Sequence, residues 1–202
     1  MVQLLKLCLV LKQLFKQFNS ADWIASVRLF VIPVILTTTL LHWQLATAII
    51  VFIALLTDVV DGQVARRFHM QSKFGAKLDS IGDASLFIAS FCCLLLFFPQ
   101  FFKAHWWQTA LLMGLYLFQI VYPLIRFKRL TAYHTYAAKL SAVTEGLFIT
   151  VCLFYQPIEW LFYLTWAVGL IEQIDELSLL FVLPQPKEDV KGIYWVLKKH
   201  HP

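Results

Sequence analysis

The sequence predicts an all-α integral membrane protein with six transmembrane helices, preceded by an N-terminal amphipathic interfacial helix. Hydrophobic residues make up 60% of the 202 residues and charged residues 14%, whereas a soluble domain is about half apolar and a quarter charged. The apolar residues also gather in runs of roughly 20, the length that crosses the hydrocarbon of a bilayer. A chain of this length predicts one domain over residues 1–202.

The predicted interfacial helix covers residues 1–20. Leu4, Leu7, Leu11 and Phe15 repeat at helical spacing, and the lysines of this segment lie off that stripe. A helix of this kind lies at the membrane surface, with its lysines near anionic lipid. A secretory signal peptide would instead place its charges before an unbroken apolar core. Because lysines interrupt the core here, we favour the interfacial helix.

Six apolar segments follow, and each is predicted to cross the membrane. They cover residues 23–41, 45–66, 79–98, 106–125, 139–155 and 158–183. Residues 184–202 are polar and basic, and they are predicted to form a cytoplasmic tail.

The distribution of positive charge predicts the orientation. In this layout, all of the 17 lysines and arginines except Lys103 fall on the side of the N-terminus. The positive-inside rule then places both termini and the loop between the second and third spans at the cytoplasmic face, in a bacterial cytoplasmic membrane. The net charge of +5 is therefore explained by topology, and no nucleic-acid partner is expected.

An acidic motif joins the second and third spans. Its four aspartates stand in an otherwise strongly apolar chain: Asp58, Asp61, Asp79 and Asp83. The first two share a helix face with Gly62 and Ala65, and the last two share a second face with Gly75, because residues three or four apart are neighbours on a helix. A short loop between two antiparallel helices would let the four carboxylates converge.

Converging carboxylates in a membrane need a positive partner. One carboxylate deep in a membrane helix costs about 2.5–3.5 kcal/mol on insertion scales. Mg²⁺ is usually held by a few carboxylates together with substrate phosphates, so the motif predicts a metal site that receives a phosphate compound. The alternative is a set of salt bridges with nearby basic residues: Arg66, Arg67, Lys73 and Lys77.

The motif also resembles a known family. It reads Asp58-x2-Asp61-Gly62-x2-Ala65-Arg66-x8-Gly75-x3-Asp79-x3-Asp83, and it matches the signature of the CDP-alcohol phosphotransferases at every fixed position. The resemblance implies that a CDP-linked substrate binds two Mg²⁺ or Mn²⁺ ions through its pyrophosphate, that an alcohol hydroxyl attacks the distal phosphate, and that CMP leaves. It also implies a homodimer.

The resemblance implies a role for each motif residue. The metal ligands would be Asp58, Asp61, Asp79 and Asp83, and Asp83 would also act as the general base. The nucleotide would be bound by Asp58, Gly62, Ala65, Arg66, Gly75 and Asp79. For Gly62 and Ala65, close helix packing is the alternative, because small residues are common at helix contacts in membranes.

Within the family, the nearest resemblance is to phosphatidylglycerophosphate synthases. It rests on Arg28 and Pro33 in the first span and on the run FGAKLD at residues 74–79. It implies phosphatidyl transfer from CDP-diacylglycerol to a small alcohol in phospholipid biosynthesis, with glycerol 3-phosphate as the first candidate acceptor. The same chemistry with inositol phosphate, inositol or serine is the alternative.

Basic residues around the fourth and fifth spans are candidates for acceptor binding. Arg126 and Lys139 could hold an acceptor phosphate through charge-assisted hydrogen bonds. Alternatively, both side chains extend to anionic head groups and only set the topology.

Four further acids lie in the last two spans: Glu145, Glu172, Asp175 and Glu176. They could form a second metal site, or pair with Lys139, Arg28 or Arg126, because buried membrane charges usually find partners. A more remote alternative for the whole chain is a divalent-cation transporter, which would use acids spread across the membrane depth as its ion path.

Overall fold

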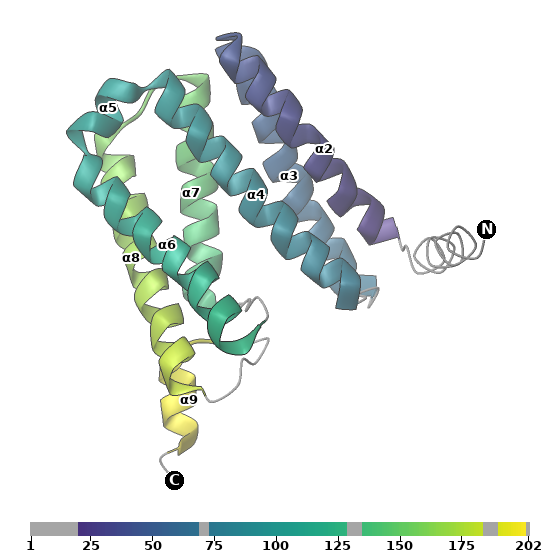
Figure 1. Cartoon of the computed structure of the whole chain (residues 1–202), viewed down its shortest axis with the longest axis vertical. Helices are drawn as coiled ribbons and strands as arrows, with labels where there is room; N and C mark the ends of the chain where they lie inside the picture. The colour runs from purple at the N-terminus through teal and green to yellow at the C-terminus, as the bar shows by residue number, and fades with distance from the viewer. Residues whose placement is uncertain (1–19, 69–72, 129–134, 184–189, 201–202) are drawn as a thin grey trace. The chain divides into compact units, whose positions relative to one another are not determined.

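A computed structural model describes the backbone of residues 20–68, 73–128, 135–183 and 190–200, and the side chains in these ranges except those of 20–29, 58–80, 199 and 200. This described part is entirely α-helical, with eight helices and no strand (Figure 1). The helices are α2 (Ser20–Leu40), α3 (Gln44–Phe68), α4 (Lys73–Phe97), α5 (Pro99–Ala104), α6 (Trp106–Phe127), α7 (Tyr136–Phe154), α8 (Glu159–Val182) and α9 (Ile193–His200).

Each of the six apolar segments coincides with one long helix, which confirms the all-α prediction. Two helices begin earlier than predicted: α4 begins at Lys73 and not at residue 79, and α7 begins at Tyr136 and not at residue 139. The short helices α5 and α9 were not predicted. The interfacial helix at residues 1–20 lies outside the described residues, except for its last residue.

Two helices, α6 and α7, are each long and apolar enough to cross a membrane. Shorter apolar stretches cover Phe30–Leu40, Gln44–Thr57 and Ile81–Phe97. The helix α8 has 24 residues, but it also carries the acids of the last predicted span, and it is not among these candidate spans. The crossing of the membrane by all six segments stays a prediction.

The chain forms two compact units, Met1–Ser90 (unit 1) and Phe91–Pro202 (unit 2). In unit 1, α2 and α3 pack against each other as an antiparallel hairpin. A tight turn joins them, in which His42 has a φ of 56° and the Trp43 N–H donates to the Thr38 carbonyl at 2.9 Å. Below the turn, the hydroxyl of Thr47 donates to that of Thr38 at 2.9 Å, and both are buried.

In unit 2, α8 packs against both α6 and α7. Three hydrogen bonds between helices accompany this contact. The Thr165 hydroxyl donates to the Thr144 carbonyl at 3.3 Å, the Trp166 indole to the Gln108 carbonyl at 3.1 Å, and the Gln119 amide to the Gln173 carbonyl at 3.3 Å. The short helix α9 packs against α8.

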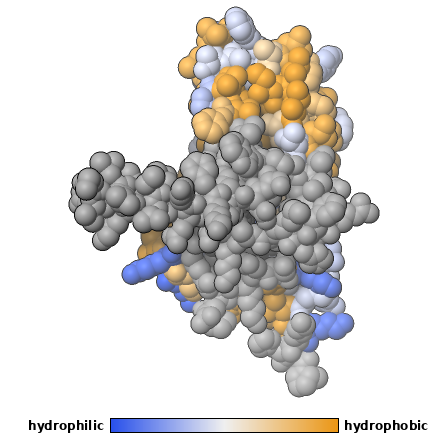
Figure 2. Space-filling view, turned by 90° about the vertical axis from the view of Figure 1, so that its right-hand side faces the viewer, coloured by the Kyte–Doolittle hydropathy of each residue, from blue (hydrophilic) through white to orange (hydrophobic). Residues whose placement is uncertain are grey.

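Large apolar side chains are exposed on the long helices. In unit 1 they include Phe30, Leu40, Leu45 and Ile53, with Phe30 77% exposed. Figure 2 shows hydrophobic surface over much of the upper, coloured part of one face. Contiguous apolar surface of this kind marks a membrane or protein contact, and it agrees with helices that face lipid.

The α2–α3 contact predicts a stability difference between two neighbouring residues. Ile35 is fully buried, whereas Leu36 is 38% exposed. We expect Ile35→Ala to lower the free energy of unfolding by about 2–4 kcal/mol, because it leaves a cavity in a packed contact. Leu36→Ala is the matched control and should lower it by less than about 1 kcal/mol. Thermal or denaturant unfolding in detergent measures both, and equal losses would contradict the assignment of the buried face.

Candidate functional site

The first half of the acidic motif lies in the last turns of α3. This helix runs without a break to Phe68, so helical backbone extends through Asp58, Asp61, Gly62 and Ala65. At this spacing, the four positions share one helix face. Their side chains, and that of Arg66, lie outside the described residues.

The second half of the motif lies in the first turns of α4, which puts Gly75, Asp79 and Asp83 on one helix. Because residues 69–72 connect the two helices, the end of α3 and the start of α4 lie within about 18 Å of each other by chain length alone. Of the four aspartates, only Asp83 has a described side chain, and it is exposed. The roles predicted for these residues stay predictions.

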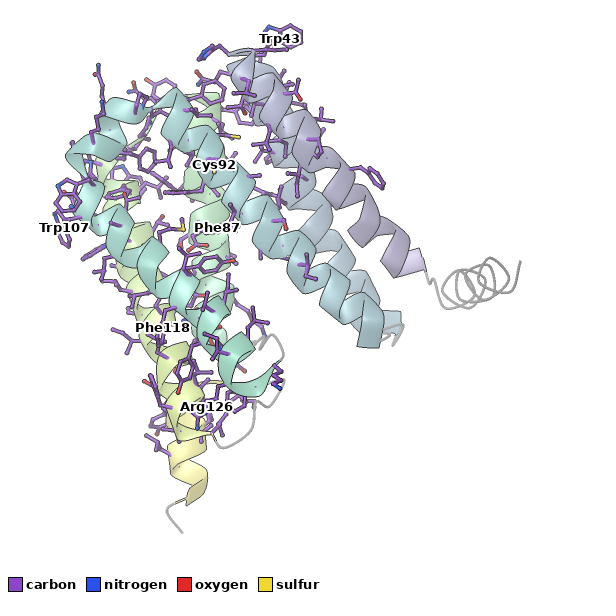
Figure 3. The ribbon with its side chains drawn as sticks, viewed as in Figure 1. Trp43, Phe87, Cys92, Trp107, Phe118 and Arg126 are labelled. Atoms are coloured by element: carbon purple, nitrogen blue, oxygen red, sulfur yellow. The ribbon has the colours of Figure 1, made fainter. Side chains whose placement is uncertain are left out.

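Arg126 lies in the last turn of α6, where aromatic residues of the same helix hold it. Its Nη1 atom donates to the Tyr122 hydroxyl at 3.0 Å, and its guanidinium carbon lies 5.0 Å from the centroid of the Phe127 ring. Tyr122 itself stacks on Phe118 at 5.2 Å between centroids. Figure 3 shows Phe118 and Arg126 along the final turns of α6. An exposed arginine over aromatic faces gains about 0.5–1 kcal/mol, and it keeps donors free for a ligand.

Lys139 lies in the first turn of α7. Its Nζ atom is 5.4 Å from the centroid of the Tyr136 ring, and the side chain is exposed. The helix start is fixed by Thr135, which is fully buried and whose Oγ1 accepts a hydrogen bond from the Ala138 N–H at 3.0 Å. Since α6 ends and α7 begins at the same end of unit 2 (Figure 1), both predicted acceptor-binding cations lie at that end.

Two of the four further acids accept a hydrogen bond from a nearby donor. Glu145 accepts a hydrogen bond from the Ser141 hydroxyl at 3.1 Å, and Asp175 accepts one from the Ile193 N–H at 2.8 Å. Glu172 lies within electrostatic reach of Glu145 and Glu176. The described contacts do not pair these acids with Arg126 or Lys139, and the expected pairing with Arg28 lies outside the described side chains.

The described part of the chain contains no group of three His, Cys, Asp or Glu residues that could hold a metal ion. The acids of α7 and α8 thus form no such group in the described structure.

Sequence reasoning missed two features of this end of unit 2. One is the cap at Thr135, which the Thr-x-x-Ala spacing before an apolar run could have indicated only weakly. The other is the contact between Asp175 and α9, which joins residues 18 positions apart. Asp175 was grouped with its acidic neighbours, since helical spacing cannot tell which of them faces a backbone N–H.

Comparison with known proteins gives two matches. A family model described as CDP-alcohol phosphatidyltransferase matches residues 18–171. A CDP-diacylglycerol--glycerol-3-phosphate 3-phosphatidyltransferase of Rickettsia bellii (strain RML369-C) is 34% identical over 71 residues, which is 34% of this chain and 39% of the relative. The match thus spans well under half of the relative's length. No solved structure matches the chain significantly.

The cap of α7 predicts a difference between two substitutions of one residue. Thr135→Ala removes the oxygen that accepts from the Ala138 N–H, and we expect it to lower the free energy of unfolding by about 1 kcal/mol. Thr135→Ser keeps this oxygen and should lose less than half as much. Unfolding in detergent measures both variants, and a serine variant as weak as the alanine variant would show that packing of the methyl group matters instead.

Proposed function

Because this chain belongs to the CDP-alcohol phosphatidyltransferase family, whose model matches residues 18–171, we propose that it transfers a phosphatidyl group from CDP-diacylglycerol to a small polar alcohol in phospholipid biosynthesis. The other product is CMP. The observation that carries this proposal is the family match, which spans the whole acidic motif. Glycerol 3-phosphate is the first candidate acceptor, because the Rickettsia bellii relative is named for it. Inositol phosphate, inositol and serine are the alternatives.

The donor set of the motif fits a pair of hard divalent cations, since carboxylate oxygens are the ligands that Mg²⁺ and Mn²⁺ prefer. In this proposal the ions are held by Asp58, Asp61, Asp79 and Asp83. When bound, such ions neutralise a pyrophosphate and stabilise the oxygen that leaves.

Asp83 is the proposed general base. The acceptor oxygen forms a bond to the phosphorus that carries diacylglycerol, and the bond from this phosphorus to the bridging oxygen of the pyrophosphate breaks. CMP leaves with that electron pair, and the acceptor proton passes to the Asp83 carboxylate. The exposed side chain of Asp83 supports access of a substrate, and a positioned base contributes typically about 10²–10⁴-fold to a rate.

Nucleotide binding is assigned to the motif's small and polar residues: Asp58, Gly62, Ala65, Arg66, Gly75 and Asp79. Helix positions without large side chains let a flat base approach the backbone. Arg66 supplies positive charge for the phosphates.

Acceptor binding is assigned to Arg126 and Lys139. Both cations are exposed, and both rest on aromatic rings of their own helices. No acid neutralises them in the described contacts, which supports a role in binding the phosphate of glycerol 3-phosphate.

The membrane, the topology and the oligomeric state belong to the same proposal. We infer a homodimer in a bacterial cytoplasmic membrane, with six spans in a single domain over residues 1–202. Both termini and the active site face the cytoplasm, where soluble acceptors and divalent ions are available.

The proposed activity is measured as CMP release from CDP-diacylglycerol by the purified protein with Mg²⁺ and glycerol 3-phosphate. We expect Asp83→Asn to lower the rate at least about 100-fold, because it removes the base and one metal ligand. Chelation should abolish CMP release, and added Mg²⁺ or Mn²⁺ should restore it. Glu159→Gln changes an exposed acid at the start of α8 and should not alter the rate. Full activity of Asp83→Asn would contradict its assignment.

The acceptor assignment is tested by Lys139→Gln. We expect the KM for glycerol 3-phosphate to rise about 10-fold, since a lost charge-assisted hydrogen bond costs about 1.5–3 kcal/mol and each 1.4 kcal/mol is about tenfold. The KM for CDP-diacylglycerol should stay the same. Lys103→Gln, on α5, is the matched control and should change neither value. If inositol or serine supports CMP release where glycerol 3-phosphate does not, the first candidate acceptor is wrong.

A further inference from the structure

The C-terminal helix α9 is anchored by an aspartate of another helix. Asp175, on α8, accepts a hydrogen bond from the Ile193 N–H at 2.8 Å, and Ile193 is the first residue of α9. A carboxylate at this place satisfies a free N–H of the first turn and interacts favourably with the positive end of the helix dipole. Asp175 therefore acts as an N-terminal cap supplied from outside α9.

The residue before α9 is built for this contact. Gly192 has a φ of +143°, which L side chains rarely adopt, and a Cβ atom there would lie 3.2 Å from Asp175 Oδ2 and 3.3 Å from Oδ1. Glycine is thus required by both the backbone and the close approach of the carboxylate. The anchor is a specific arrangement of two residues.

One side of α9 supports the aromatic residues that contact Arg126. Ile193 and Val196 pack against a buried cluster formed by Leu179, Leu180 and Leu183. Tyr122 and Phe127 pack against the same cluster. These are the two rings that contact the Arg126 guanidinium.

The other side of α9 contacts Tyr136, whose ring lies near Lys139. The Tyr136 N–H donates to the Lys191 carbonyl, just before α9, at 3.3 Å. The rings of Tyr136 and Trp195 lie 5.4 Å apart, centroid to centroid. Tyr136 in turn provides the ring near Lys139 Nζ, at 5.4 Å.

We propose that α9 is a clamp that positions Arg126 and Lys139 for the anionic acceptor, with Asp175 as its anchor. The proposal rests on the proposed function for the assignment of the acceptor to these two cations. Asp175, Tyr136 and Trp195 are positioning residues, since they act through other side chains. Release of α9 would leave the rings beside both cations free to repack, and the acceptor would then bind more weakly.

The decisive pair of variants is Asp175→Ala and Asp175→Asn in the full chain. Alanine removes the oxygen that accepts from the Ile193 N–H, whereas the amide oxygen of asparagine keeps it. We expect Asp175→Ala to raise the KM for glycerol 3-phosphate at least fivefold and to leave kcat and the KM for CDP-diacylglycerol within twofold. Asp175→Asn should stay within twofold of the wild type in all three values.

A second pair tests the path to Lys139. Tyr136→Leu removes the ring, and Tyr136→Phe keeps it. The leucine variant should reproduce the effect of Asp175→Ala on the acceptor KM, and the phenylalanine variant should behave like the wild type. If the leucine and phenylalanine variants behaved alike, the proposed coupling of α9 to Lys139 through the Tyr136 ring would be wrong.

A readout without catalysis separates this inference from the proposed function. Lys139 is acylated with a water-soluble N-hydroxysuccinimide ester in nanodiscs, and its labelling rate is read by peptide mass spectrometry. We expect at least a twofold change of the rate in Asp175→Ala and none in Asp175→Asn. A wild type that turns over no acceptor contradicts the proposed function, and the labelling comparison then still decides whether Asp175 positions Lys139.

Three results would overturn the clamp. The first is wild-type labelling in Asp175→Ala. The second is an altered labelling rate with an unchanged acceptor KM, because α9 would then hold Lys139 without affecting the acceptor. The third is an equal loss of kcat and of thermal stability without a change of the acceptor KM, which indicates a merely structural contact.

Discussion

The structure depends on the need to satisfy polar groups inside a chain that is mostly apolar. Helices meet this need for the backbone, and many hydroxyl groups follow the same rule by donating to a carbonyl of their own helix one turn earlier. Thr37 does so at 2.7 Å, Thr150 at 2.7 Å and Ser178 at 2.6 Å. The few described hydrogen bonds between helices therefore stand out, and they mark the contact of α2 with α3 and the contacts of α8 with α6, α7 and α9.

The same constraint determines how charge is accommodated at the end of unit 2 that carries α9. Arg126 and Lys139 lie on aromatic rings, and Asp175 binds a backbone N–H. Charges of opposite sign thus have separate local partners, where ion pairs would have been the simpler solution. A cation held on a ring keeps most of its field and its donors, because the ring does not neutralise it. This arrangement suits the binding of an anion better than an ion pair would.

Sequence alone predicted the helices and the family motif, because both depend on short-range spacing. The apolar runs determine six long helices, and the fixed intervals from Asp58 to Asp83 identify the motif without any tertiary information. The start of α7 was missed because it depends on the buried hydroxyl of Thr135. The docking of α9 was missed because it depends on a contact between Asp175 and Ile193, and helical periodicity within α8 contains no information about a segment outside it.

The acids of this chain show why residue type alone is a weak guide to a site. Glu145 and Asp175 resemble the motif aspartates in composition and apolar setting, yet each finds a nearby hydroxyl or N–H donor. Each donor gives its carboxylate a local partner that residue type alone does not predict. The motif is set apart in the sequence, because four aspartates recur at fixed helical intervals together with Gly62, Ala65 and Gly75. Spacing together with small neighbours, rather than the number of acids, is therefore the sequence signal on which the proposed binding role of the motif rests.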